Sequence, residues 1–306
     1  MTRRMASCAM VARAVLPTRR SLSTVPLAGR PLSSTAPVAH VSDTAVVDGL
    51  VVSRSPCGEV LHVTLDRPKK HNALSSAVVD GLLATVRAAS CDDSATRLLV
   101  LRGNGKSLCA GFDFEGIEDQ SDADVALRFL RLEMLLASLH HAPFASLALI
   151  QGACFGAGAD LAAACSSRVA APEAKFRMPG LLFEVVLGTR RLADQVGTSA
   201  ARRLLESCKV FDVEEAMVTG FVTQVAKEAD WDAIAADAAA AARALPRSAQ
   251  RALLERTRRS DSRDADLAAL ARSVAAPGLK DRIVEFRRQQ QTQRGKVRSK
   301  REKLKA

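Results

Sequence analysis

The feature that most constrains the fold is an alternation of short apolar strands with amphipathic helices between residues 60 and 171. Residues 60–65 (VLHVTL) are rich in β-forming side chains, and Pro68 ends this run because proline cannot continue a strand ladder. Residues 75–89 carry apolar side chains at helical spacing, and residues 97–102 form a second short apolar run. This order predicts parallel strands joined by right-handed crossovers, and hence an α/β fold.

The same unit recurs further along the chain. It is expected as a helix over 124–140, a strand over 144–150, a turn over 152–158, a helix start over 159–164 and a strand over 167–171. From residue 198 onward the pattern is helical and alanine-rich, with breaks at Pro246 and at 277–278. We therefore predict an α/β core over 43–245, a helical region over 246–290 and a basic tail over 291–306.

The net charge of +11 is concentrated at the two ends of the chain. Residues 1–42 contain six arginines and no acid, while residues 287–306 contain nine Lys/Arg against Glu302 alone. Subtracting the +6 and +8 of these ends leaves residues 43–286 at −3, so the predicted globular part is nearly neutral. The Arg- and Ser-rich composition of residues 1–42 is typical of a mitochondrial transit peptide, which predicts a matrix location.

Several other classes of protein are not favoured. Charged residues interrupt every apolar run before roughly 18 residues, so no transmembrane segment is expected. The seven cysteines show no CxxC pair and no metal-ligand spacing with histidine, so no metal site is expected. The five histidines form no triad signature, and a GxSxG elbow is missing from the sequence.

Two glycine-bearing turns can present backbone N–H groups to a ligand. They are residues 106–113 (KSLCAGFD) and 151–160 (QGACFGAGAD), and each follows a predicted strand. Such turns can also cradle phosphates, but the first strand is followed by no GxGxxG, and neither turn ends in Gly-Lys-Ser/Thr. The pattern therefore argues against a dinucleotide site and against a P-loop.

Together with these turns, residues 66–74 (DRPKKHNAL) and 176–179 (FRMP) resemble the four signature segments of the crotonase (enoyl-CoA hydratase/isomerase) superfamily. The resemblance extends to residues 279–286 and covers roughly 55–290. It implies a crotonase-like fold of repeated ββα units with a helical C-terminal region, and a homotrimer or hexamer. It also implies an acyl-CoA thioester as the partner, with coenzyme A as part of the substrate and no permanently bound cofactor.

By this resemblance, the backbone N–H groups of Phe112 and Ala157 hold the thioester carbonyl oxygen. Alanine at 157 replaces the usual glycine of the family, but the donor is an amide, so it can still serve. Asp160 matches one of two hydratase glutamates and is the expected general acid or base, since it lies one helical turn beyond Ala157. The alternative role for Asp160 is to satisfy the dipole in the first turn of its helix.

The other hydratase glutamate is replaced by Gly180. Glycine cannot polarise a water molecule, so single-carboxylate isomerisation is favoured over standard hydratase activity. Glu184 would compensate if residues 180–187 were helical, because it would then lie one turn beyond Gly180; a solvated acid is the competing interpretation. The resemblance also implies a set of residues that bind coenzyme A or shape its site: Lys69, Lys70, Asn72, Ala73, Leu74, Ala110, Asp113, Gly156 and Phe286.

Three function classes remain open from the sequence. The first is an enzyme that forms a thioester enolate. The second is a catalytically inactive member of the same fold that acts in a mitochondrial assembly. The third is an RNA-associated homologue, for which the cationic residues 287–306 supply charge for phosphates but no aromatic platform for bases.

Overall fold

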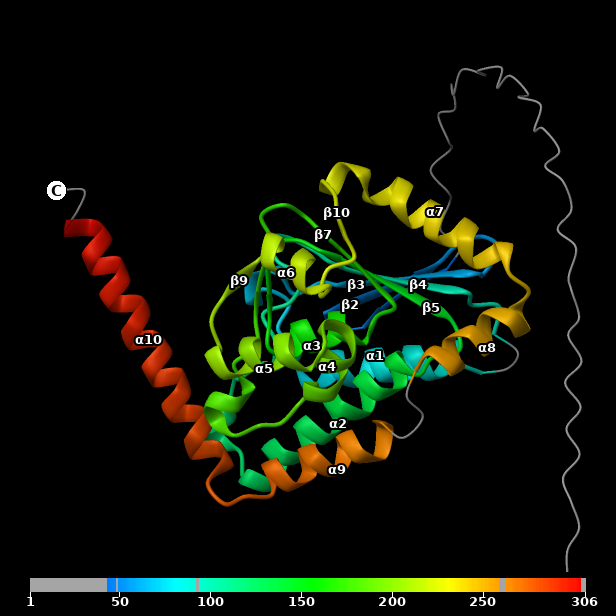
Figure 1. Ribbon diagram of the computed structural model, residues 1–306. Coiled ribbons are helices and arrows are strands. Elements are labelled where there is room, and N and C mark those ends of the chain that lie inside the picture. The colour runs from blue at the N-terminus through cyan, green and yellow to red at the C-terminus, as the bar shows by residue number, and fades with distance from the viewer. Residues whose placement is uncertain (1–42, 48, 92–93, 259–261, 304–306) are drawn as a thin grey trace, which may run out of the picture. The chain divides into compact units, whose positions relative to one another are not determined.

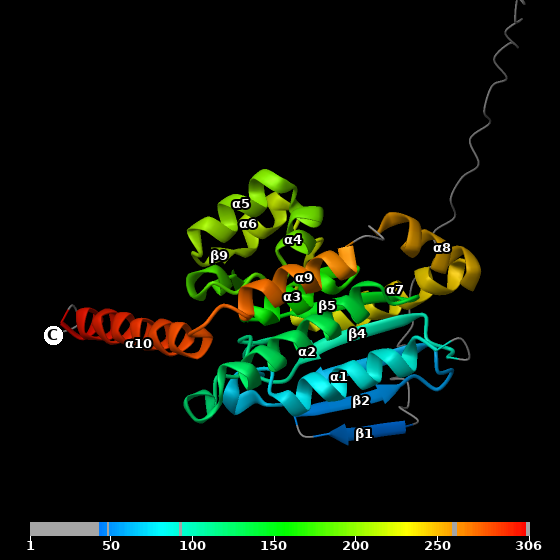
Figure 2. The same ribbon diagram turned by 90° about the horizontal axis from the view of Figure 1, so that it is seen from below.

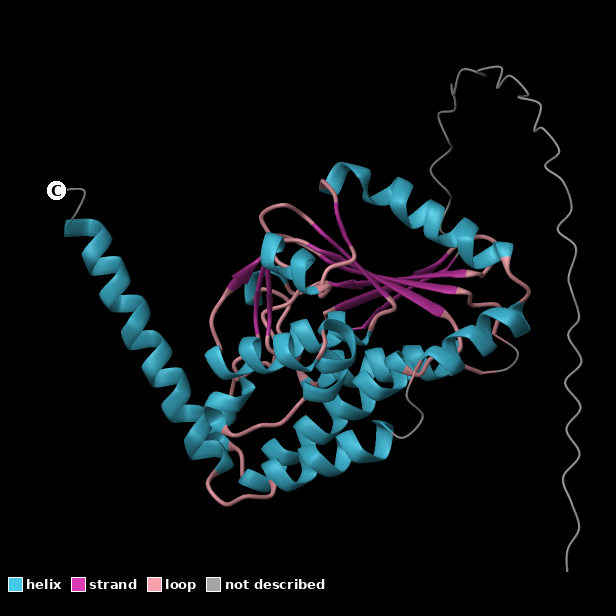
Figure 3. Ribbon diagram, in the orientation of Figure 1, coloured by secondary structure: helices cyan, strands magenta, loops and turns pink. Residues whose placement is uncertain are grey.

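The computed structural model describes residues 43–303, apart from 48, 92–93 and 259–261. The predicted leader, residues 1–42, and residues 304–306 lie outside this described part. The expected α/β architecture is confirmed: strands and helices alternate through the first half of the described chain, and helices dominate the second half. Figure 3 shows the strands in the middle of the molecule with helices on either side of them.

Among the described residues, seven strands form the main sheet in the order β1-β2-β3-β4-β5-β7-β10. The first three are antiparallel neighbours, and the pairs from β3 to β10 are parallel. Their bounds are β1 Asp43–Val47, β2 Leu50–Arg54, β3 Val60–Leu65, β4 Leu98–Gly103, β5 Ala145–Ile150, β7 Ser167–Ala170 and β10 Gln224–Val225.

A second sheet of three short strands, among the residues described, has the order β6-β8-β9. These strands are β6 Ala153–Phe155, β8 Lys175–Arg177 and β9 Phe211–Asp212. The strand β6 lies inside the segment 152–158 that the sequence predicts only as a turn. It pairs in parallel with β8, so β5 and β7 are each followed by a short strand of the second sheet.

Both faces of the main sheet are covered, because its central strands are apolar on both sides. In β4, Leu99 and Leu101 belong to the larger core with α1 (Ser76–Ala89), α2 (Asp122–His140) and α3 (Ala157–Ala164). Leu98 and Val100 face the opposite core with α7 (Trp231–Ala244). Figure 1 shows α1 and α2 on one side of the sheet and α7 on the other.

The remaining helices include α8 (Arg247–Thr257) and α10 (Leu279–Lys303), which begin just after the breaks expected at Pro246 and at 277–278. The others are α4 Thr189–Val196, α5 Thr198–Ser207, α6 Val213–Thr219 and α9 Ser262–Val274, with short 3-10 helices η1 Pro68–Lys70, η2 Ile117–Asp119, η3 Gly180–Phe183 and η4 Glu228–Asp230. The start of α10 contacts α2, η2 and η3, and the helix then projects away from the other elements (Figure 2). The predicted boundary at residue 290 therefore falls inside α10.

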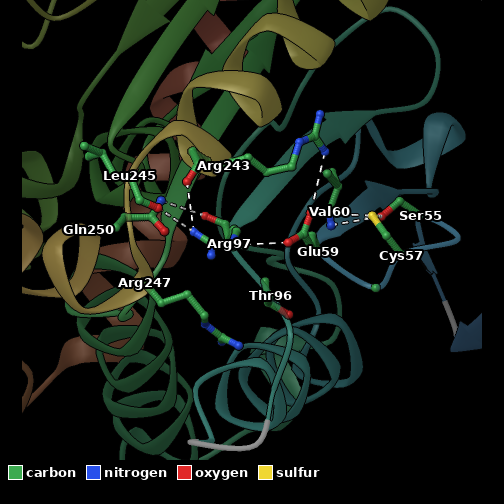
Figure 4. A network of polar contacts seen from close by, with 12 residues as sticks. Ser55, Cys57, Glu59, Val60, Thr96, Arg97, Arg243, Leu245, Arg247 and Gln250 are labelled. Carbon is green, nitrogen blue, oxygen red and sulfur yellow. Dashed lines mark hydrogen bonds and ion pairs between the residues drawn. The ribbon is translucent and has the colours of Figure 1, made fainter.

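A polar network fastens the turn between α7 and α8 to the start of β4 (Figure 4). The Arg97 guanidinium donates to the carbonyl oxygens of Ala242 and Leu245 and forms an ion pair with Glu59 at 3.2 Å. Gln250 returns a hydrogen bond to the Arg97 carbonyl oxygen. The network thus holds the end of α7 and the start of α8 at the beginning of β4, the opposite end of this strand from the one that leads into the first glycine-bearing turn.

The sequence predicts the long elements better than the short ones. The strand expected over 60–65 is confirmed at β3, and the helix expected over 124–140 corresponds to α2. The region after residue 198, expected to be almost wholly helical, also contains the strands β9 and β10, each only two residues long. In the described part of the chain, no helix is long and apolar enough to cross a membrane.

Candidate functional site

A cavity of about 270 Å³ lies where the two glycine-bearing turns meet the starts of α3, α4 and α10. Both turns contribute to its wall, through residues 110–112 and 155–157. Its wall is mainly apolar, and six phenylalanines contribute to it: Phe112, Phe114, Phe129, Phe155, Phe183 and Phe286. Among the described residues that line it, Asp160 is the only carboxylate.

The first turn is held by the segment that precedes α1. The Leu74 amide donates to the Gly111 carbonyl oxygen at 2.8 Å, and the Asp113 amide donates to the Leu74 carbonyl oxygen at 3.1 Å. These two hydrogen bonds use the carbonyl group of the residue before Phe112 and the amide of the residue after it. Within the described chain, the Phe112 amide makes no backbone hydrogen bond, so it is available to a ligand in the cavity.

The second turn leads directly into α3. Gly156 precedes the helix with a φ of 51°, a left-handed value that glycine adopts without steric cost. Ala157 is the first residue of α3, so its amide has no acceptor within the helix, and no other described backbone group accepts from it. This amide lies at the positive end of the helix dipole.

The two turns approach each other backbone to backbone. A Cβ atom built on Gly111 would lie 2.6 Å from the Phe155 carbonyl oxygen and 3.3 Å from the Ala157 nitrogen. A Cβ atom on Gly158 would similarly lie 2.5 Å from the Cys109 carbonyl oxygen. The same glycines therefore allow this close packing, and the structure brings Phe112 and Ala157 together in the wall of one cavity.

Asp160 lies in the first turn of α3 and is only 6 % exposed. Burial raises its pKa to about 8; the Arg191 guanidinium opposes this rise and the Glu133 carboxylate adds to it. A Cβ atom on Gly188 would lie 2.0 Å from Asp160 Oδ1, so the backbone before α4 packs directly against the carboxyl group. An acid in this environment can accept or release a proton near neutral pH.

The structure places Gly180 in the cavity wall and Glu184 outside it. The condition for Glu184, a helix over 180–187, is not met: the segment begins as the short helix η3, which ends at Phe183, and Glu184 has a left-handed φ of 62°. The Glu184 side chain is 68 % exposed and forms an ion pair with Arg282 at 3.3 Å. Glu184 therefore does not replace the carboxylate that is missing at Gly180.

The residues expected to bind coenzyme A separate into two groups. Ala110, Gly156 and Phe286 line the cavity. The stretch from Lys69 to Leu74 lies behind the first turn and is not part of the cavity wall as described. Lys70 is exposed and forms an ion pair with Glu115 at 2.9 Å.

Two of the expected residues, Asn72 and Asp113, take part in bonds that brace the first turn, and neither lines the cavity. Asn72 is buried, and its Nδ2 donates to the carbonyl oxygens of Asn104 and Ser107. Arg67 donates to Asp113 Oδ2 at 2.6 Å and also to the Ala73 carbonyl oxygen. Burial is the largest single influence on Asp113 and disfavours its charged form. The hydrogen bonds from Arg67 and from the Glu115 amide, together with the charges of Arg67 and Arg128, outweigh it and keep the pKa of this carboxyl below its ordinary value.

Several residues near the cavity were not singled out from the sequence. Phe129 stacks on Phe112 at 4.3 Å between ring centroids, and Phe183 packs against Phe286 at 5.0 Å. Glu133 and Arg191 form a buried ion pair behind Asp160. The sequence contains a sign that Glu133 is buried, because this acid lies between apolar residues in the helix predicted over 124–140. The described residues contain no group of three metal-ligand side chains.

A family model described as enoyl-CoA hydratase/isomerase matches residues 57–276. One curated relative, "Probable enoyl-CoA hydratase echA6" of Mycobacterium bovis, is 35% identical over 197 residues, covering 63% of this chain and 78% of that protein. A human relative, "Enoyl-CoA hydratase domain-containing protein 2, mitochondrial", is 33% identical over 180 residues, covering 57% and 61%.

The fold also has solved counterparts. A structure from Bordetella parapertussis, described as an enoyl-CoA hydratase/isomerase, is 47% identical, with a TM-score of 0.74. The match covers 78% of this chain and 98% of that chain. The similarity therefore spans both glycine-bearing turns and the elements that support them.

Proposed function

Because this chain belongs to the enoyl-CoA hydratase/isomerase family, we propose that it binds an enoyl-CoA thioester and moves its double bond, using one carboxylate. The observation that carries this proposal is the cavity in which Asp160 is the only described carboxylate, beside two amides without backbone acceptors. The apolar wall suits an acyl chain without charges. Coenzyme A enters as part of the substrate.

In the proposed mechanism, the amides of Phe112 and Ala157 donate hydrogen bonds to the thioester oxygen. As the enolate forms, negative charge develops on that oxygen, and the two donors stabilise the charge more strongly than they stabilise the neutral carbonyl. The dipole of α3 adds to this effect at Ala157. The α-carbon of the bound thioester consequently becomes acidic enough to lose a proton to a nearby base.

Asp160 is the proposed base. Its ionised form takes the proton from C2 of a 3-enoyl-CoA, which gives a dienolate, and returns the proton to C4 to leave a 2-enoyl-CoA. One carboxylate is sufficient, because the proton removed is the proton replaced. Addition of water would require a second group to polarise the water, and the position that would carry it is Gly180.

The test is conversion of a medium-chain 3-enoyl-CoA to the 2-enoyl-CoA, followed by chromatography and by the absorbance of the conjugated thioester. We expect isomerisation without formation of 3-hydroxyacyl-CoA, and a rate that rises with pH toward a midpoint near 8, since the base must be ionised. Binding of acyl-CoA with no turnover at any pH would contradict the proposal and support the inactive assembly protein instead.

A gain-of-function variant examines the role of Gly180 directly. Gly180→Glu should introduce measurable hydration of 2-enoyl-CoA, because two carboxylates would then flank the site. A Cβ atom at this position lies 3.0 Å from the Val185 carbonyl oxygen, so the backbone must shift slightly, and the φ of Gly180 is not in the left-handed region. Gly180→Gln, which adds the same bulk without the charge, is the matched control and should give no 3-hydroxyacyl-CoA.

We also propose that the protein acts in the mitochondrial matrix. The arginine-rich, acid-free composition of residues 1–42 supports this location, and one relative carries the word mitochondrial in its name. Import of the full chain into isolated mitochondria should protect it from added protease. A chain that starts at residue 43 should not be imported and should remain sensitive to the protease. Equal protection of the full chain and the shortened chain would contradict the proposed role of residues 1–42 in import.

A further inference from the structure

A buried ion pair joins α2 to α4 directly behind the candidate site. Arg191 donates through Nη1 to Glu133 Oε1 at 2.9 Å and through Nη2 to Glu133 Oε2 at 2.5 Å, and each side chain is 1% exposed. Asp266 of α9 lies 3.5 Å from the same guanidinium. Apolar residues of similar volume usually stabilise a core as well as such a pair does, so stability alone is a weak explanation for it.

The helix α4 presents one face to α3, and Arg191 lies on that face. Gly188 packs against the Asp160 carboxyl group at the start of this face, and Gln195 Nε2 donates to the Ala163 carbonyl oxygen at its end. Arg191 is three residues after Gly188 and four before Gln195, so helical geometry places all three on one stripe. The guanidinium is therefore held beside the helix that carries Asp160.

Two carboxylates, Glu133 and Asp266, lie beside the Arg191 guanidinium, but they do not use all of its hydrogen-bond donors. Its Nε atom is buried and has no hydrogen-bond partner among the described residues. The groups that face Asp160 from neighbouring elements are Arg191 of α4 and Glu133 of α2, which have opposite effects on the charge of its carboxyl group.

Other titratable groups nearby are neutral or engaged elsewhere. Cys154 of β6 is neutral, because burial raises the pKa of its thiol. Arg177 of β8 lines the same cavity but donates to the Cys208 carbonyl oxygen and to Gln290. Asp266 lies on the Arg191 side of the cluster.

We propose that Arg191, with its charge balanced by Glu133, is a positioning residue that sets the protonation state of Asp160. The pair does not touch the substrate. Arg191 favours the ionised carboxylate that removes the substrate proton, and Glu133 limits this effect, so that Asp160 can hold the proton long enough to return it. The inference rests on the proposed function, because it assigns Asp160 the task of moving a proton.

The first test is Glu133→Gln, which keeps the shape of the side chain and removes one negative charge. Asp266 remains as a counter-charge to Arg191, so the variant keeps a partner for the buried guanidinium. We expect the pH midpoint of isomerisation to fall by about one unit, as expected when a nearby charge is removed. The matched control is Glu215→Gln, an identical change in the ion pair between Glu215 and Arg203 on α6 and α5, which should leave the midpoint unchanged.

A second variant moves the midpoint in the opposite direction. In the double variant Glu133→Leu/Arg191→Met both charges are replaced by apolar groups, a change that buried ion pairs commonly tolerate. The midpoint should rise, because the Arg191 contribution is the larger of the two. If the ion pair had only a structural role, the pH midpoints of the two variants would not shift in opposite directions.

The protonation of Asp160 can also be followed without turnover, by ¹³C NMR titration of its carboxyl carbon, assigned by comparison with Asp160→Asn. Midpoints that agree within error in the wild type, Glu133→Gln and the double variant would overturn the inference. That result would leave the proposed function intact if isomerisation persists. Loss of the proposed function would instead appear as an absence of wild-type turnover while the Asp160 midpoints still shift.

Discussion

Asp160→Asn is expected to lower the rate of isomerisation by about 10²–10⁴-fold, the usual contribution of a positioned acid or base. Asparagine keeps the size of the side chain but cannot accept a proton at accessible pH. Binding of acyl-CoA should persist, because the amides of Phe112 and Ala157 and the apolar wall are unchanged. Turnover and binding are measured separately, by chromatography of the products and by calorimetric titration.

The same substitution should stabilise the protein near neutral pH. The folded state raises the pKa of Asp160 from 3.8 to about 8, so the stabilising contribution of this group is fully present below about pH 4. That contribution is lost progressively as the pH rises toward 8. At pH 7 this loss lowers the unfolding free energy of the wild type by roughly 4 kcal/mol. The asparagine variant has no ionisable group at this position and does not lose this stability.

Urea unfolding at pH 5 and pH 8 checks this expectation. The difference in unfolding free energy between Asp160→Asn and the wild type should be larger at pH 8. Asp237→Asn makes the same chemical change at an exposed position on α7 and should alter neither activity nor stability. Full activity of Asp160→Asn would remove this residue from the mechanism.

Gly111→Ala is expected to have the second large effect on turnover, because it displaces the backbone donors. The added Cβ atom would lie 2.6 Å from the Phe155 carbonyl oxygen and 3.3 Å from the Ala157 nitrogen, so the two turns must separate. Displacement of one donor from a thioester oxygen is expected to lower the turnover number by about 10²–10³-fold. The comparison is made at saturating substrate, so that weaker binding does not contribute.

Gly116→Ala is the matched control for this variant. Gly116 also has a positive φ, of 67°, but its added Cβ atom would meet nothing within 4 Å. Both substitutions therefore introduce backbone strain, and only the one at Gly111 affects the turns. Equal losses of activity in the two variants would indicate that strain, rather than the position of the amides, is responsible.

The α/β class, the position of the cavity at the glycine-bearing turns and the family were predictable from the sequence. Strand and helix periodicity is a local property, and β3 and α2 bury enough apolar residues to show it clearly. The family resemblance rests on backbone-shaping residues, Gly111 and Gly156 among them, that a sequence displays directly. These features need no knowledge of distant contacts.

The remaining features depend on contacts between segments far apart in the chain. The strand β6 is three residues long and is stabilised by its pairing with β8, so it has no periodicity of its own. The Glu184 side chain points away from the cavity because its backbone is left-handed after a 3-10 helix. A continuous helix over this segment would not produce that change of direction. The contact of Gly188 with Asp160 joins two helices and leaves no local pattern.

A crystal structure with acetoacetyl-CoA bound tests the central claim most directly, since the 1,3-dicarbonyl group imitates the enolate. The account predicts that the thioester oxygen accepts hydrogen bonds from the amides of both Phe112 and Ala157, and that Asp160 is the carboxylate nearest to C2. A thioester oxygen bound elsewhere, or a different carboxylate beside C2, would contradict it.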